Sequence, residues 1–169
     1  MAVHNNSISP TFEGFPKFNI VVVDDSPLNQ KILSKLLSTL NQEVTTFSSG
    51  EDALTHLQSV AELPRLVISD FNMKQDHMNG FEFISALRKI ERLAPLHCIL
   101  WTDDQAAKEG HDWVELKVTQ FLAKPAKVID VGQAIAKFIE LNSLAVSRSS
   151  DTSPEVDEDS SDGERLNAS

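Results

Sequence analysis

Several features that would place this sequence in other classes of protein are missing. Cys98 is the only cysteine in the 169 residues, so no intrachain disulfide can form. No basic segment leads into an apolar one, as in a secretory signal peptide. No apolar run approaches the roughly 18 residues that a membrane-spanning helix needs. We therefore expect a protein of the reducing cytoplasm that has no membrane partner.

An excess of positive charge is also missing. The chain has 25 acidic residues against 15 lysines and arginines, which gives a formal net charge of −10. This charge argues against direct binding to nucleic acid, because a phosphate backbone repels an acidic surface. The five histidines do not share the spacing of metal ligands, so a zinc site is not expected either.

The acidic charge is concentrated at the C-terminal end. Residues 143–169 hold seven acidic and two basic side chains, so this short segment carries half of the net charge. It has too few apolar residues to offset the entropy of ordering, and we expect an acidic disordered tail. We expect residues 1–16 to form a flexible N-terminal arm, docked weakly by Phe12 and Phe15. Residues 17–142 remain as the folded domain.

Five segments are predicted to be strands, and each is followed by a predicted helix; residues 18–23 and 66–70 have the composition of buried strands. The expected strands cover residues 18–23, 43–47, 66–70, 96–101 and 119–123. Strands that alternate with helices form a parallel sheet with helices on both faces. We predict an α/β fold with a doubly wound, five-stranded parallel sheet of flavodoxin-like order 2-1-3-4-5.

Helix starts and ends are marked by capping residues. Ser26-Pro27 begins the first helix, Ser48 or Ser49 caps the second, and Asp103 or Asp104 caps the fourth. We expect the fourth helix to run to about Leu116. We expect the last helix to bury apolar residues between Val128 and Ile139 and to end at residue 142. Trp101 and Cys98 are expected in the core.

Three aspartates follow two strands that should be neighbours in the sheet. Asp24 and Asp25 follow the first strand, and Asp70 ends the third, so all three should lie in one crevice at the carboxyl edge. At about 4–5 Å and an effective dielectric of about 20, each pair of carboxylates repels by roughly 3–4 kcal/mol. Mg²⁺ would offset this repulsion. The alternative for Asp24 and Asp25 is helix capping with solvation.

Other polar residues should lie at the same edge. Asn29 lies in the apolar arc of the first helix and is expected to point at the site, unless it is only a polar residue of a frayed first turn. Lys124 and Thr102 each follow an apolar strand. A carboxylate nucleophile, a metal, a lysine and a hydroxyl are what phosphoryl transfer to an aspartate needs. The alternative for Lys124 is a salt bridge to the acidic cluster with no phosphate involved.

These residues occur within short motifs that resemble those of the response-regulator receiver domains of two-component signalling. The matching pieces, in the family's order, are Val21-Val22-Val23-Asp24-Asp25, Leu66-Val67-Ile68-Ser69-Asp70, Asn79-Gly80, Leu100-Trp101-Thr102 and Phe121-Leu122-Ala123-Lys124-Pro125. The resemblance covers about residues 17–142. The segment from Asp25 to Leu33 particularly resembles receivers served by hybrid histidine kinases.

The resemblance implies a role for each site residue. Asp70 would be the phosphorylation site and accept a phosphoryl group from a phosphohistidine. Asp24, Asp25, Asp70 and the backbone carbonyl of Asn72 would bind Mg²⁺. Lys124, followed by a cis bond to Pro125, would pair with the phosphate. Thr102 and Phe121 would be the switch residues.

The resemblance also implies a function and its partners. We expect a single-domain response regulator that is phosphorylated by a histidine kinase or histidine phosphotransfer protein and acts on a downstream protein that the sequence does not identify. The signal would leave through the fourth helix, fifth strand and fifth helix, where Trp113 and Ile129 are expected to be exposed. We expect no enzymatic activity other than self-phosphorylation and self-dephosphorylation at Asp70. Asn72 and Asp104 are expected to tune the rate at which the phosphoryl group on Asp70 is hydrolysed.

Two other interpretations remain open at this point. One is an interaction module of the same fold that works without phosphate. The other is an enzyme of the haloacid-dehalogenase type, which needs a second acid two residues after the nucleophile, where this chain has Asn72. The chain also departs from the family near the site, because the loop after Asp70 is longer than usual and Lys74 replaces a common proline. Lys117 stands where a glycine is usual.

Overall fold

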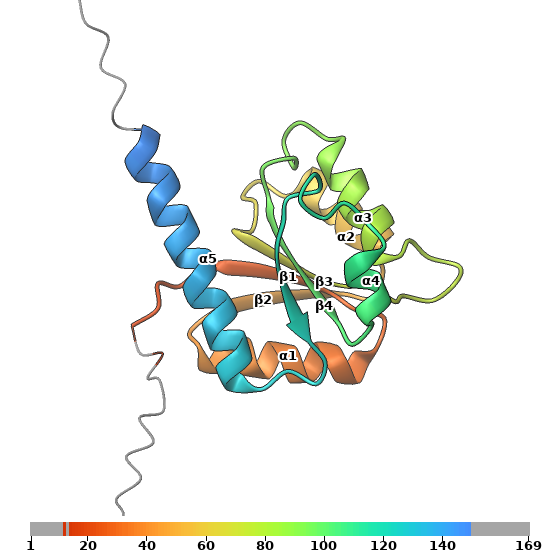
Figure 1. The fold of residues 1–169 in the computed structure, drawn as a ribbon, viewed down its shortest axis with the longest axis horizontal. Helices are drawn as coiled ribbons and strands as arrows, with labels where there is room; N and C mark the ends of the chain where they lie inside the picture. Colours follow the sequence, from red (N-terminus) through yellow and green to blue (C-terminus); the bar gives the residue numbers. More distant parts are fainter. Residues whose placement is uncertain (1–11, 13, 150–169) are drawn as a thin grey trace, which may run out of the picture.

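A five-stranded parallel sheet forms the centre of the computed structural model, which describes residue 12 and residues 14–149. The strand order is β2-β1-β3-β4-β5, which confirms the predicted topology. Strands and helices alternate along the described chain (Figure 1). Their bounds are β1 Asn19–Val23, α1 Pro27–Thr39, β2 Glu43–Phe47, α2 Gly50–Ser59, β3 Leu66–Asp70, α3 Gly80–Arg88, β4 His97–Thr102, α4 Gln105–Glu109, β5 Val118–Ala123 and α5 Val128–Ser149.

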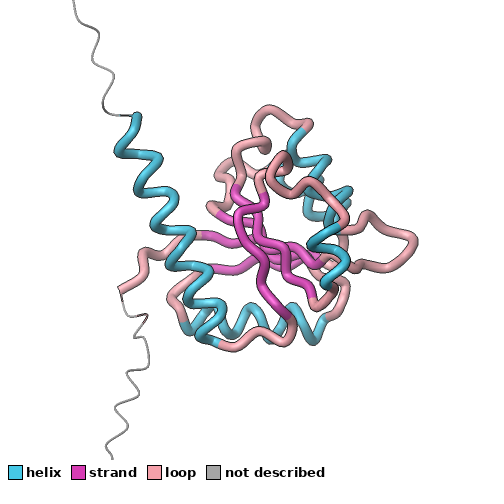
Figure 2. The backbone as a smooth tube through the Cα atoms, viewed as in Figure 1, coloured by secondary structure: helices cyan, strands magenta, loops and turns pink. Residues whose placement is uncertain are grey.

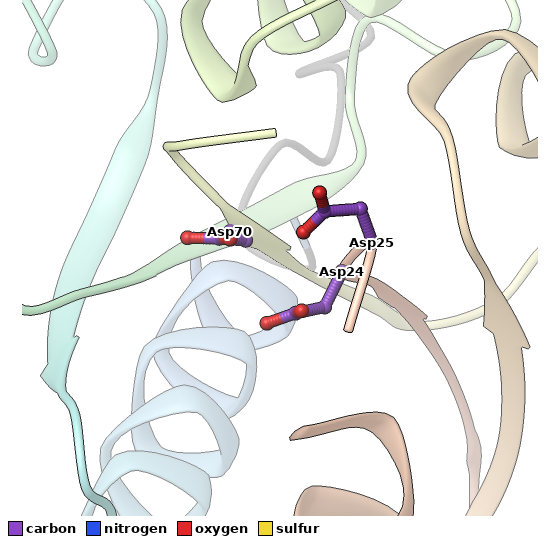
Figure 3. Close-up of side chains that lie close together, drawn as sticks. All are labelled: Asp24, Asp25 and Asp70. Carbon is purple, nitrogen blue, oxygen red and sulfur yellow. The ribbon is translucent and has the colours of Figure 1, made fainter. Parts of the chain in front are cut away.

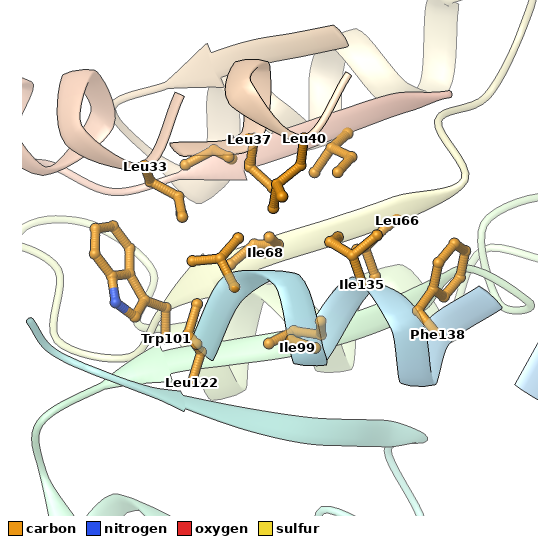
Figure 4. Close-up of a cluster of buried hydrophobic side chains, with 14 residues drawn as sticks. Leu33, Leu37, Leu40, Leu66, Ile68, Ile99, Trp101, Leu122, Ile135 and Phe138 are labelled. Atoms are coloured by element: carbon orange, nitrogen blue, oxygen red, sulfur yellow. The ribbon is translucent and has the colours of Figure 1, made fainter. Parts of the chain in front are cut away.

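The sheet is covered on both faces, and each face has its own apolar cluster. Alternate residues of a strand point to opposite faces, so Ile20 and Val22 pack under α1 and α5 while Val21 and Val23 pack under α2 and α3. Figure 4 shows the cluster beneath α1 and α5. All five residues of β3 are buried, which places Asp70 at the end of the central, fully covered strand.

The helices begin next to capping residues that are visible in the sequence. The Ser26 side chain accepts a hydrogen bond from the Asn29 N–H at the start of α1, and Ser49, rather than Ser48, caps α2. Asn79 and Glu82 form a capping box at the start of α3. These caps fix where each helix leaves the carboxyl edge of the sheet, where the site residues gather.

The fourth helix is shorter than predicted. α4 covers only Gln105–Glu109 and is followed by turns up to β5. The Trp113 side chain is 5% exposed, and its indole N–H donates to the Ala107 carbonyl at 2.8 Å. The prediction of an exposed Trp113 was therefore wrong, because the turn folds this ring back under α4. Lys117 ends the turn with a left-handed φ of 54°, the conformation that favours the usual glycine.

The last helix is longer than predicted. α5 continues to Ser149, so the expected end at residue 142 was wrong for the helix. Within this helix, Asn142 and Ser143 donate side-chain hydrogen bonds to the carbonyls of Phe138 and Ile139, one turn earlier. Residues 150–169 of the expected acidic tail lie outside the described residues.

Part of the N-terminal arm contacts the domain. The rings of Phe12 and Phe15 lie 5.7 Å apart and pack against the cluster beneath α1 and α5. The Phe12 ring lies directly against Gly132 of α5, where a Cβ atom would come within 2.4 Å of it. The docking expected of these two phenylalanines is therefore observed, and residues 1–11 and 13 of the arm lie outside the described residues. Among the helices described, none is both long and apolar enough to cross a membrane.

Candidate functional site

Three carboxylates meet at the carboxyl edge of the sheet. Asp24 and Asp25 follow β1, and Asp70 is the last residue of β3, the strand that pairs with β1. One oxygen from each lies within 4.8 Å of the others, as Figure 3 shows at the ends of the two strands. Asp24 is fully buried and Asp70 is 4% exposed. The expected crevice of aspartates is thus present.

Asp24 is fixed by several hydrogen bonds. Its carboxylate accepts the Ser26 N–H at 2.8 Å and lies 3.2 and 3.3 Å from the Asn29 amide nitrogen. Its backbone carbonyl accepts the side-chain amide of Gln30 at 2.6 Å. Asn29 therefore points at the site as expected, and Gln30 is a further contact that the sequence did not reveal. The start of α1 orients Asp24 by these contacts.

Lys124 connects the two buried aspartates. Its Nζ lies 2.8 Å from an oxygen of Asp24 and 3.1 Å from an oxygen of Asp70. The Lys124–Pro125 peptide bond is cis, as the resemblance implied. These ion pairs fit a lysine that would bind a phosphoryl oxygen. By themselves they also fit the salt bridge considered as the alternative.

Burial raises the pKa of Asp70 above its ordinary value. The ammonium of Lys124 opposes this shift, the neighbouring charge of Asp24 adds to it, and the N–H of Asn72 donates to Asp70 at 3.2 Å. Lys124 has a larger effect on this pKa than Asp24 has, so burial is the main reason that the pKa of Asp70 stays raised. Hard oxygen ligands of this kind fit a divalent cation such as Mg²⁺.

The two predicted switch residues lie on adjoining strands. Thr102 ends β4, is fully buried, and accepts the Asp104 N–H through its hydroxyl at 3.0 Å. Phe121 of β5 is 39% exposed, and its ring lies 6.1 Å from that of Trp113 in an edge-on arrangement. Thr102 is thus engaged beside α4, and Phe121 points outward toward solvent.

The loop between β3 and α3 passes close to the site and is anchored at both ends. The loop projects from the body of the domain (Figure 2). Gly80 donates its N–H to the Phe71 carbonyl, and a Cβ atom here would lie 2.4 Å from the Asp70 carbonyl oxygen. The motif Asn79-Gly80 therefore needs glycine for the close approach of two backbone segments at the start of α3.

Glu51 of α2 anchors the same loop from another side. It accepts the Met78 N–H at 2.8 Å and lies 3.6 Å from the His77 ring nitrogen. Burial acts to raise the pKa of Glu51, but the Met78 hydrogen bond and His77 outweigh it, and the net shift is downward. The sequence did not reveal this role of Glu51, since a contact 27 residues away leaves no local signal.

One pocket brings most of the predicted residues together. Its lining includes Asp25, Asn29, Asp70, Asn72 and Lys124, and it continues along α1 and the segment before α5. Thr102 and Phe121 are not among the lining residues. The accessible crevice presents the carboxylates of Asp25 and Asp70 and the ammonium of Lys124, and the fully buried Asp24 contacts that ammonium. These are the groups that transfer of a phosphoryl group to an aspartate requires.

The family model of the response regulator receiver domain matches residues 20–136. The chain belongs to the response regulator receiver family. The matched segment contains every site residue described above. Receiver domains are signalling phosphoacceptors that bind Mg²⁺ at a cluster of aspartates, and the cluster in this chain fits that pattern.

Similar proteins place this receiver domain among two-component and phosphorelay proteins. The two-component response regulator ORR3 of Oryza sativa subsp. japonica is 27% identical over 124 residues, covering 73% of this chain and 92% of that protein. Hybrid signal transduction histidine kinase L of Dictyostelium discoideum is 31% identical over 123 residues, covering 70% of this chain and 7% of the kinase. The structure of chemotaxis response regulator CheY4 of Vibrio cholerae shares the fold, with a TM-score of 0.64 at 24% identity, and covers 73% of this chain and 99% of its own.

Proposed function

We propose that this receiver domain accepts a phosphoryl group on Asp70 from the phosphohistidine of a histidine kinase or histidine phosphotransfer protein. In this step a carboxylate oxygen of Asp70 attacks the phosphorus atom, the nitrogen–phosphorus bond breaks, and the imidazole leaves. The observation that carries the proposal is the Lys124 ammonium, which lies within 3.1 Å of Asp70 while three carboxylate oxygens gather within 4.8 Å.

Each site residue has a defined task in this step. Asp24, Asp25, Asp70 and the backbone carbonyl of Asn72 would hold Mg²⁺, which when bound offsets the charge of the carboxylates and of the phosphoryl oxygens. Asn29 and Ser26 keep Asp24 oriented toward this position. Lys124 binds a phosphoryl oxygen once the group is on Asp70.

The switch follows from the positions of Thr102 and Phe121. The Thr102 hydroxyl oxygen accepts the Asp104 N–H, and a phosphoryl group on Asp70 would offer a charged acceptor for the hydroxyl hydrogen. Movement of Thr102 toward Asp70 would let the exposed ring of Phe121 pack inward, which shifts a two-state equilibrium. The signal then passes to a downstream protein through α4, β5 and α5, where Ile129 is 37% exposed.

Acetyl phosphate labelling tests the phosphoacceptor function. The wild-type chain should take up acid-labile phosphate only when Mg²⁺ is present, and Asp70→Asn should take up none. Asp76→Asn, an exposed aspartate of the same loop, is the matched control and should behave as the wild type. Equal labelling of Asp70→Asn and wild type would contradict the assignment. No labelling of any variant, even by a phosphorylated phosphotransfer protein, would favour an interaction module that works without phosphate.

A further inference from the structure

Lys124 reaches the site across an intervening strand. It follows β5 at one edge of the sheet, whereas Asp70 ends β3, and β4 lies between them. Neighbouring strands lie about 4.8 Å apart, so the Lys124 side chain must extend over β4 to contact Asp70. The β4 residue at this level is Trp101, which is paired in register with Asp70 on one side and with Leu122 on the other.

The indole of Trp101 lies beneath the Lys124 ammonium. Nζ is 4.6 Å from the centre of the ring, and Trp101 is 2% exposed. This distance and burial are those of a desolvated cation–π contact, for which tryptophan is the best partner. The indole N–H is buried and has no hydrogen-bond partner among the described residues. The contacts found for this residue therefore involve its ring and not its polar atom.

We propose that Trp101 is a positioning residue that holds the Lys124 ammonium beside Asp70; this inference rests on the proposed phosphoacceptor function. The other contacts of Nζ are the carboxylates of Asp24 and Asp70. These two carboxylates belong to the cluster that fits a divalent cation, so their attraction for Lys124 weakens when a cation engages them. The indole contact does not depend on the carboxylates. It keeps Lys124 directed at the position where phosphoryl oxygens arrive.

The same apolar cluster supplies a matched control. Figure 4 shows Trp101 at one end of the labelled side chains and Phe138 at the other. Phe138 is an aromatic residue of α5 with the same 2% exposure, but it lies away from Lys124. Replacing either ring by leucine removes aromatic area from one cluster, and only Trp101→Leu removes the surface under the ammonium.

Proton chemical shifts test the contact without phosphate or metal. In the wild-type chain the ε-methylene protons of Lys124 should be shifted upfield of those of exposed Lys137 by the ring current of the indole. Trp101→Phe should retain an upfield shift, Trp101→Leu should abolish it, and Phe138→Leu should leave it unchanged. Ordinary Lys124 shifts in the wild type would overturn the proposal.

The rate of phosphorylation tests whether the indole contact of Lys124 assists the reaction at Asp70. With acetyl phosphate and Mg²⁺, Trp101→Leu should react about tenfold more slowly than wild type, as expected for loss of a desolvated cation–π contact. Trp101→Phe should stay within about threefold, and Phe138→Leu should react at the wild-type rate even if it melts earlier. A wild-type rate in Trp101→Leu would overturn the positioning role. If the wild type takes up no phosphate from acetyl phosphate or from a phosphorylated phosphotransfer protein, the proposed function is wrong, and the chemical shifts alone decide whether the indole contacts Lys124.

Discussion

At the scale of single residues, Asp70 combines burial with two close charges of opposite sign. Burial and Asp24 favour the protonated form, and Lys124 favours the ionised form. Because burial raises the pKa of Asp70 in the folded state, the folded protein keeps this proton to a higher pH than the unfolded chain does. Ionised Asp70 therefore destabilises the fold above its folded pKa. This penalty disappears below the ordinary value of 3.8.

The first prediction concerns stability and pH. In the absence of divalent cations at pH 7, Asp70→Asn should raise the free energy of unfolding by about 1 kcal/mol, because the charge is removed and the shape is kept. The gain should shrink as the pH is lowered toward the ordinary pKa of aspartate. Denaturant unfolding at several pH values measures this. A gain that grows on acidification, or a loss of stability at pH 7, would contradict the account.

The second prediction concerns the lifetime of the phosphorylated state. Asn72 is exposed beside Asp70, and neither it nor Asp104 forms an apolar lid, so water can approach the phosphate in line. Phosphorylated Asp70 should therefore be short-lived, and Asn72→Leu should lengthen its lifetime. Asp104 already accepts two N–H groups of α4, so its replacement should also loosen that helix. Decay after removal of the donor measures the lifetime. Hours of persistence, unaffected by Asn72→Leu, would refute this prediction.

At the scale of elements, α4 and β5 are connected to the rest of the domain by aromatic contacts between residues far apart in the sequence. Trp113 lies edge-on to Phe71, which follows Asp70, and to Phe121 of β5. Arg88 of α3 donates to the carbonyls of Leu116 and Lys117 in the turn before β5. A five-residue helix with few contacts of its own can shift when these neighbours move.

The third prediction places the response to phosphorylation on these elements. Beryllofluoride, which substitutes for the phosphoryl group, should change amide chemical shifts most in α4, β5 and the following loop, beyond the immediate site. The reason is that Thr102 and Phe121 border this region. Spectra with and without beryllofluoride measure the change. Changes confined to residues 26–60 would count against an output face formed by α4, β5 and α5.

The same elements show where sequence reasoning succeeds and where it fails. The five strands, their order in a doubly wound sheet and the aspartates at two strand ends were predicted from the sequence, and all of these are present. The edge strand β2 has no buried residue, whereas all of β3 is buried. The fourth helix was expected to run to about Leu116, but Gly110 ends α4 and Trp113 folds back on Ala107. Glu51 and Trp101 act through contacts with other elements, which no local pattern reveals.

At the scale of the whole molecule, the described domain contains the complete site, and its two apolar clusters are built from residues before Ser143. Leu144 near the end of α5 is 54% exposed, so the last turns of the helix contribute little to these clusters. Most of the excess acidic charge at the C-terminal end lies beyond Ser149.

The fourth prediction concerns that acidic segment. A chain ending at Ser149 should melt within a few degrees of full length and take up phosphate equally well, because a segment so poor in apolar residues adds little to a core. A second chain ending at residue 142 shows whether the last turns of α5 contribute to stability. Thermal unfolding of the three chains measures the effect. A loss of more than about 2 kcal/mol on removing residues 150–169 would mean that they contact the domain.

The central claim is that Asp70 is the residue that carries the phosphoryl group. Borohydride reduces an aspartyl phosphate to homoserine, so treatment of the phosphorylated wild-type chain followed by peptide mass spectrometry identifies the modified position. The account predicts homoserine at position 70, formed only when both the donor and Mg²⁺ were present. Homoserine at Asp24, Asp25 or any other aspartate, with Asp70 unmodified, would contradict it.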